Sequence, residues 1–127
     1  LRDAAHYWLA SVRPDGRPHT VPVDGLWRGD HLVFGGDPAT VHHRNLLAAT
    51  DVTVHLPDAD AATIVEGVAE RHTPVAIEAH DLARASREKY GYSPPASAFR
   101  EGVWLVRPRV VLAWTALYRD ATRYCFA

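Results

Sequence analysis

The amino-acid sequence predicts a mainly β protein, a small antiparallel β-barrel of six or seven strands with two packed helices. Short apolar or alternating segments, typical of strands, recur along the 127 residues. Turn signals rich in Gly, Pro and Asp separate them, and only two stretches have the composition and boundary residues of helices. Strands at such short spacing pair as antiparallel neighbours and curl into a small barrel.

The first three strands are expected to form an antiparallel meander. Residues 6–12 are aromatic and apolar and end at the Pro-Asp-Gly turn of residues 14–16. Residues 19–27 alternate well enough for a second strand. Pro22 within it cannot donate a backbone hydrogen bond and so marks an edge, a bulge or a gap in pairing. A short turn then leads to a third strand at residues 31–34.

A first helix is expected over residues 40–49, followed by strands at 52–56 and 63–71. Gly67 lies inside the second of these strands. An interior glycine suggests a bulge or a bend where a barrel curls.

The second helix is expected to begin at Thr73-Pro74, an N-cap followed by a first-turn proline, and to end near Tyr90. A long strand follows at residues 103–114, interrupted near Pro108. Residues 121–126 form the last strand.

Composition indicates one domain, residues 1–127, and excludes some partners. The formal net charge is −1, which gives no electrostatic case for nucleic acid or an anionic membrane. No apolar run approaches the roughly 20 residues that cross a bilayer, and no signal-peptide pattern opens the sequence. Cys125 is the only cysteine, which fits a reducing cytoplasm, and we expect it to be a packed thiol in the last strand.

One stretch, residues 32–47, predicts an anion site. It runs from an apolar strand through Gly35-Gly36 into a helix. The start of a helix presents free backbone N–H groups and the positive end of the helix dipole. Thr40 adds a hydroxyl group, and Arg44 adds a planar charged group on the same helix flank. We interpret this stretch as a phosphate-binding segment.

The alternative is a strand–turn–helix connection that binds nothing. Asp37 would then be the N-cap and Pro38 the first helical residue. A carboxylate capping the helix would occupy the place of a phosphate, so this alternative stays open.

Several motifs, taken in order, resemble those of the split β-barrel flavin and deazaflavin oxidoreductases, the superfamily of the pyridoxamine 5'-phosphate oxidases. The chain looks most like the actinobacterial branch of this superfamily, which includes proteins that use coenzyme F-420. The motifs are Trp-Leu-Ala-Ser-Val-Arg-Pro-Asp-Gly-Arg-Pro-His at 8–19, Val-Pro-Val at 21–23, Leu-Val-Phe at 32–34, Thr40 with Arg-Asn-Leu at 44–46, Val-Glu-Gly-Val-Ala-Glu at 65–70, Lys-Tyr-Gly at 89–91 and Ala-Thr-Arg-Tyr-Cys-Phe at 121–126. The resemblance covers nearly the whole chain.

The resemblance implies a homodimer with two cofactor sites at the subunit interface. It implies that the second strand lies along the cofactor ring and that the third strand's end and the following helix hold the phosphate. The expected cofactor-binding residues are Thr20, Val21, Pro22, Val23, Phe34, Gly35, Gly36, Thr40, His42, His43, Arg44 and Asn45.

One departure from the family pattern bears on the cofactor. The family commonly has a lysine where this chain has His42, followed by His43. A neutral imidazole contributes a hydrogen bond where lysine contributes a full charge. One arginine with a histidine suits the single charge of the F-420 phosphodiester better than the dianionic phosphate of FMN, so F-420 is preferred. If either histidine contacts the phosphate, affinity is expected to fall as pH rises through about 6.5.

Two further departures concern the substrate side. Asp24-Gly25 replaces bulky aromatic residues, and Asp24 is the candidate catalytic residue, a proton donor or hydrogen-bond partner; the alternative is a solvated turn residue. The chain also lacks the longer basic ending of true pyridoxamine-phosphate oxidases, so that reaction is not expected.

The function hypothesis is hydride transfer between F-420 or FMN and a small conjugated substrate. The alternative is a non-catalytic protein that binds or sequesters a cofactor, with a haem-binding relative as a weaker form. No metal site is expected, because adjacent histidines of a helix diverge and no Cys-x-x-Cys or His-Glu-x-x-His pattern is present.

Overall fold

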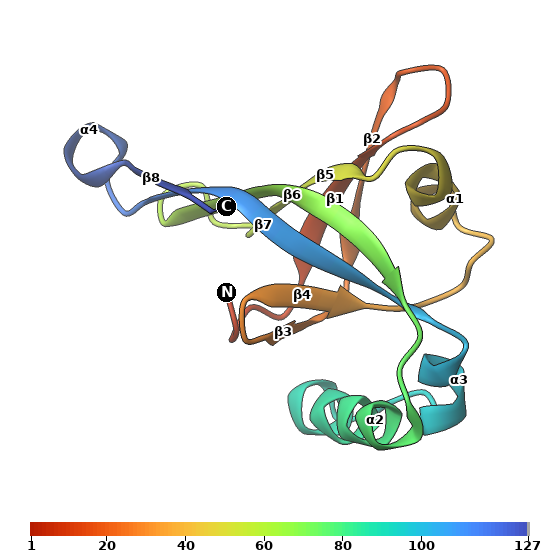
Figure 1. Ribbon diagram of the computed structural model, residues 1–127. Helices are drawn as coiled ribbons and strands as arrows, with labels where there is room; N and C mark the ends of the chain where they lie inside the picture. Colours follow the sequence, from red (N-terminus) through yellow and green to blue (C-terminus); the bar gives the residue numbers. More distant parts are fainter. Residues whose placement is uncertain (127) are drawn as a thin grey trace.

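The computed structural model describes residues 1–126, in which eight strands and four helices follow one another along the chain (Figure 1). The strands are β1 (Tyr7–Val12), β2 (Pro18–Val23), β3 (Leu26–Arg28), β4 (His31–Phe34), β5 (Asp51–His55), β6 (Ala62–His72), β7 (Val103–Trp114) and β8 (Thr122–Cys125). The helices are α1 (Val41–Ala48), α2 (Ala76–Tyr90), α3 (Ala96–Arg100) and α4 (Leu117–Asp120).

All eight strands join one antiparallel sheet in the order β2-β1-β5-β6-β7-β4-β3, with β8 beside β7. The sheet curls into a half-barrel, with α1 near one end and α2 and α3 below β3 and β4 (Figure 1). The predicted mainly β, antiparallel fold is therefore confirmed. Pro22 lies, as predicted, on an edge strand, because β2 pairs only with β1.

The expected second strand over residues 19–27 is two strands, and this prediction is wrong at Asp24-Gly25. There the chain passes from β2, at one edge of the sheet, to β3, at the other. Gly25 makes the crossing in a confined space, since a Cβ atom on it would lie 2.8 Å from Leu32 Cδ1. We call residues 24–25 the seam, because they join the two edges of the curled sheet.

The long β6–β7 pair contains the predicted irregularity. Its register shifts between Glu66 and Gly67, where Gly67 pairs with Pro108 and Glu66 with Val110. The shift leaves Arg109 as the extra residue, so β7 continues through Pro108. The bulge at Gly67 is confirmed, and the predicted interruption of β7 is wrong because the bulge absorbs the proline.

The helix boundaries differ from the expected ones. Helix α2 starts at Ala76 with Val75 as N-cap, two residues after the predicted start, because the chain at Val75 is still extended (φ −71°, ψ 167°) and Pro74 is fully buried. The short helices α3 and α4 were not expected.

Cys125 is exposed on β8, so the prediction of a packed thiol is wrong. No helix among residues 1–126 is long and apolar enough to cross a membrane.

Two clusters of buried apolar side chains stabilise the curled shape of the sheet. The larger fills the inside of the half-barrel and includes Leu9, Phe34 and Trp104; the smaller, with Val33 and Leu82, holds α2 against β3, β4 and β7. Successive residues of a strand point to opposite faces, so Val33 and Phe34 serve different clusters. The end of β4 is therefore buried on both faces.

Candidate functional site

A pocket of about 460 Å³ lies beside the seam, which is within the usual size range of small-molecule sites. The end of β2, the seam, the end of β4, the start of α1 and the segment from α2 to α3 enclose it. Its lining residues are Pro22, Val23, Asp24, Gly25, Leu26, Val33, Phe34, Gly35, Gly36, Asp37, Thr40, His42, His43, Ser86, Tyr90, Tyr92, Pro94 and Phe99.

A larger open groove of about 660 Å³ lies over β3 and α2. It is lined by side chains of both charges, among them Arg2, Asp3, Arg28 and Glu88. Arg28 is already paired with Asp81 of α2. The smaller pocket is the better candidate, because an apolar wall there meets a few convergent polar groups.

One end of the pocket is formed by the start of α1. Thr40 is the N-cap, and no acidic residue lies in the first turn. The backbone N–H groups of Val41, His42 and His43 find no acceptor within residues 1–126. Gly36, with φ +120°, turns the chain back toward the His43 ring, which a Cβ atom there would approach to 3.4 Å. These free donors and the helix dipole favour an anion at this end.

Asp37 does not cap α1, so the expected capping alternative is wrong. Its carboxylate accepts from the N–H of Ala39 at 2.8 Å and closes its own turn ahead of the helix. Its backbone carbonyl accepts from the N–H and the hydroxyl of Thr40. The carboxylate therefore leaves the first N–H groups of α1 free.

The two histidines form a compact pair against Phe34. Their ring centroids lie 4.5 Å apart, and both rings are about 6 Å from the Phe34 ring. Thr40 Oγ1 lies 2.6 Å from His43 Nδ1. His43 is buried. The first turn of α1 is thus held in place by its own side chains.

Both imidazoles are neutral at pH 7. Burial, with repulsion from His43 and His19, lowers the pKa of His42 to about 4. Burial and the positive charge of Arg71 lower the pKa of His43 as well. His42 of the free protein therefore titrates well below 6.5, and the pKa of His43 is shifted in the same direction. A loss of affinity as the pH rises through about 6.5 is thus not a property of the free histidines.

The expected cofactor residues outside the lining are Thr20, Val21, Arg44 and Asn45. Arg44 is exposed on α1, four residues after Thr40. Asn45 is buried and donates to Ser11 Oγ at 3.0 Å, which attaches α1 to β1. The other eight expected residues all line the pocket.

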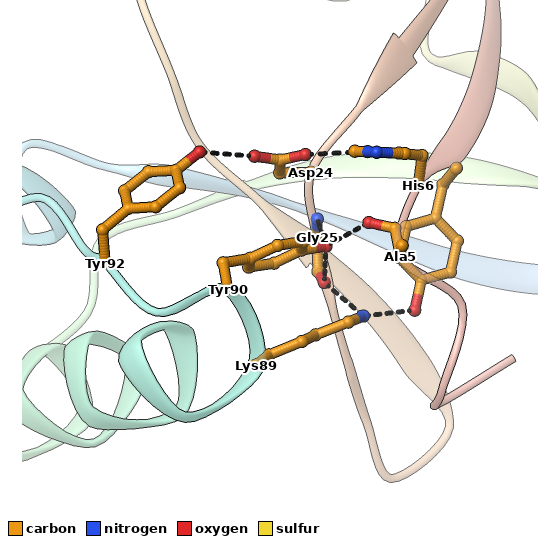
Figure 2. Close-up of polar contacts among 8 residues, drawn as sticks. Ala5, His6, Asp24, Gly25, Lys89, Tyr90 and Tyr92 are labelled. Atoms are coloured by element: carbon orange, nitrogen blue, oxygen red, sulfur yellow. Dashed lines mark hydrogen bonds and ion pairs between the residues drawn. The ribbon is translucent and has the colours of Figure 1, made fainter.

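Asp24 lines the pocket and lies between the side chains of Tyr92 and His6 (Figure 2). Its Oδ2 accepts from the Tyr92 hydroxyl at 2.9 Å, and its Oδ1 lies 3.0 Å from His6 Nδ1. The carboxylate raises the pKa of Tyr92 by accepting its hydrogen bond. Asp24 is therefore a hydrogen-bonded residue of the seam that lines the pocket.

The remaining wall of the pocket runs from α2 to α3. It brings Ser86, Tyr90, Tyr92, Pro94 and Phe99 to the side facing the seam. The sequence held one signal, the Lys-Tyr-Gly-Tyr run at the end of a helix. Gly91 adopts φ +80° there and ends α2, which turns the chain toward the pocket.

Metal-binding geometry is not seen in the described part of the chain: no three His, Cys, Asp or Glu side chains of residues 1–126 are grouped as ligands.

Solved structures share this fold. An F420 reductase aligns with 22% identity and a TM-score of 0.69 over 87% of this chain and 92% of its own. A haem-binding protein from Mycobacterium smegmatis aligns with 19% identity and a TM-score of 0.72 over 97% of this chain, which spans about half (53%) of that protein. General Stress Protein 26 from Bacillus anthracis str. Sterne aligns with 15% identity and a TM-score of 0.73 over 97% of this chain and 90% of its own.

At these identities the structural likeness concerns the fold alone. Comparison with curated protein sequences finds no relative. The family model described as Pyridoxamine 5'-phosphate oxidase matches residues 1–115, nearly the whole sequence. The chain therefore belongs to the pyridoxamine 5'-phosphate oxidase family.

Proposed function

We propose that this protein binds a flavin-type cofactor, coenzyme F-420 in preference to FMN, and transfers a hydride between its ring and a small conjugated substrate. The observation that carries the proposal is the layout of one pocket. An apolar wall from Pro22 to Leu26 leads, past Gly35-Gly36, to the free N–H groups of α1. A planar ring and a phosphate tail need these two surfaces side by side.

The residues present fit such a group. Pro22, Val23 and Phe34 offer an apolar surface to a ring. Thr40 and the N–H groups at the start of α1 offer hydrogen bonds to the tail. Arg44 shares the flank of Thr40, and from there its exposed guanidinium group can reach an anion at the helix start.

The neutral histidines support F-420 over FMN. At pH 7 the anion site contains hydrogen-bond donors, the helix dipole and the Arg44 side chain, with Arg71 near His43. His42 adds no positive charge, because its pKa is about 4. A phosphomonoester carries nearly two negative charges, while a phosphodiester carries one. The weaker positive field suits the singly charged group.

When bound, the cofactor supplies the hydride chemistry. The chain's own residues bind the tail, orient the ring and exclude water from the apolar wall. Asp24 faces the substrate side as a hydrogen-bond partner for a polar substrate group. True pyridoxamine-phosphate oxidation is not proposed.

The test is titration of the purified protein with FMN and with F-420, for the wild type and an Arg44→Ala variant. We expect tighter binding of F-420, and a loss of affinity of about tenfold in the variant, since a charged hydrogen bond contributes about 1.5–3 kcal/mol. Arg87→Ala, on the exposed side of α2, is the matched control. Wild-type affinity in Arg44→Ala would remove that residue from the phosphate site.

A second copy of the chain is proposed to complete the site, as the family resemblance implies. Large apolar side chains on α4 and β8 and just beyond β8 are exposed, namely Leu117, Tyr118, Tyr124 and Phe126. Exposed apolar surface of this kind favours association. Light scattering on the purified protein should give the mass of a dimer.

A second candidate function is binding without catalysis. It is favoured by the structural likeness to a haem-binding protein and by the two histidines that line the pocket. The absorption spectrum separates the candidates, since a deazaflavin, a flavin and a haem absorb differently. Binding of F-420 without reduction of any acceptor would support a carrier.

A further inference from the structure

Within residues 1–126, the seam is where the chain passes between the two edges of the curled sheet, and it lies outside the strand ladders. Residues 24–25 fall between β2 and β3, which pair with β1 and β4 respectively. Backbone groups that lack a ladder partner need other partners when they are buried, and Gly25 is buried.

Two consecutive side chains at the end of α2 supply these partners (Figure 2). The Gly25 N–H donates to the Tyr90 hydroxyl at 2.9 Å. Lys89 Nζ donates to the Gly25 carbonyl at 2.8 Å. Both polar groups of one glycine are therefore bonded by residues more than 60 positions away in the sequence.

The same two side chains tie the seam to the N-terminal segment. Lys89 Nζ donates to the Tyr7 hydroxyl at 2.9 Å and lies 4.7 Å from the centre of the Tyr7 ring. The Tyr90 hydroxyl donates to the Ala5 carbonyl, with 2.7 Å between the two oxygen atoms. Tyr7 is fully buried, so this attachment point belongs to the core.

Lys89 is the only lysine in the sequence. It is half-buried, and burial lowers its pKa. Desolvating an ammonium group is unfavourable unless fixed hydrogen bonds and ring faces replace the lost water. The hydrogen bonds of Lys89 to Gly25 and Tyr7, with its contact to the Tyr7 ring, provide this replacement. These contacts form together only when the seam is in one position.

We propose that Lys89 and Tyr90 are positioning residues, which hold the seam and thereby set the ring-facing wall of the pocket from Pro22 to Asp24. The role rests on the proposed function, since that wall is the surface offered to the cofactor ring. Neither residue needs to touch the reacting atoms. A shift of the seam would displace Asp24 and the adjacent end of β2 together.

The test uses the full chain with Tyr90→Phe, Lys89→Met and Lys89→Arg, and with Arg87→Met as a matched control. Arg87 is exposed on α2, two residues before Lys89. The first measurement is hydrogen exchange of the Gly25 amide without cofactor. We expect exchange about tenfold faster in Tyr90→Phe, since its acceptor is gone, and wild-type exchange in Arg87→Met.

The second measurement is the dissociation constant and the visible spectrum of bound F-420. We expect binding about 3- to 10-fold weaker in Tyr90→Phe and Lys89→Met with the melting transition retained, a spectrum shifted toward that of the free cofactor, and partial rescue in Lys89→Arg. Unchanged Gly25 exchange in Tyr90→Phe overturns the proposal. Faster exchange with wild-type affinity and spectrum overturns the positioning role.

Failure of the proposed function gives a different result. A wild-type chain that binds neither FMN nor F-420 overturns the cofactor proposal, and the positioning role with it. Gly25 exchange then reports only whether the seam is held by Tyr90. The two failures are therefore distinguishable in the same set of samples.

Discussion

Asn45 of α1 donates a hydrogen bond to Ser11 of β1 at 3.0 Å, and each residue is only 2% exposed. This buried pair attaches α1, whose first turn lines the pocket, to β1. We predict that Asn45→Ala lowers the free energy of unfolding by about 1–3 kcal/mol, because it leaves the Ser11 hydroxyl without its partner and creates a cavity. Urea denaturation measures this change.

A double-mutant cycle with Ser11→Ala checks that the pair, and not the helix alone, is responsible. The two substitutions should cost less together than the sum of the single changes. Strictly additive effects would show that the two side chains stabilise the fold independently.

Gly67→Ala should be among the most destabilising single-methyl changes in the chain. The new Cβ would overlap the Arg107 carbonyl oxygen at the β6–β7 bulge. We expect a loss of more than about 2 kcal/mol, since the long strand pair must shift to relieve the overlap. Gly35→Ala is the matched control, because its nearest neighbour would be at 3.9 Å. Equal melting temperatures for the two variants would contradict the prediction.

Stability should depend on pH through His42. The folded-state pKa is about 4 against 6.5 for the ordinary group. Between these values the unfolded chain binds a proton that the folded chain does not. The free energy of unfolding therefore rises with pH from about 4 to 6.5 and is then level with respect to this group.

The contribution is on the order of 1 kcal/mol, because the side chain is only partly buried and solvent screens the effect. His42→Gln replaces the titrating imidazole with a neutral side chain of similar size. It should flatten the dependence of the free energy of unfolding on pH between about 4 and 6.5. An unchanged pH dependence of urea denaturation in His42→Gln would assign the effect to other groups.

His42→Lys should increase affinity for FMN more than affinity for F-420. The substitution restores the cation common in the family next to the N–H groups of α1. A second negative charge on the phosphate gains more from it, so we expect about a tenfold gain for FMN and a smaller one for F-420. Titrations at two salt concentrations check the electrostatic origin, since added salt should reduce the gain. Equal gains in affinity for FMN and F-420 would show that the phosphate tail does not lie beside residue 42.

Strands with a local sequence pattern could be predicted from the sequence alone. The alternation of residues 52–56, the turn signal before residue 18 and the glycine at the β6 bulge each depend on neighbouring residues only, and each prediction agrees with the structure. The division of residues 19–27 into β2 and β3 could not be predicted in this way. It arises because Gly25 crosses beneath Leu32 of β4, a long-range packing constraint with no local pattern.

The same difference between local and long-range features applies to the candidate site. The sequence predicted the Gly35-Gly36 segment and the start of α1, which are contiguous. The opposite wall depends on Gly91 turning the end of α2 toward the seam, and Tyr90 meets Gly25 only in the folded chain. The histidine pKa values also required the fold, since burial against Phe34 is not visible in the order of residues.

The way β4 is attached has a consequence for assembly during synthesis. Among residues 1–126, the β3–β4 hairpin pairs with the rest of the sheet only through residues 104–106 of β7. A nascent chain that has not yet released these residues from the ribosome has no strand partner for the hairpin. We therefore expect the pocket to form only after residues 104–106 have emerged, and chains truncated before residue 104 should lack it.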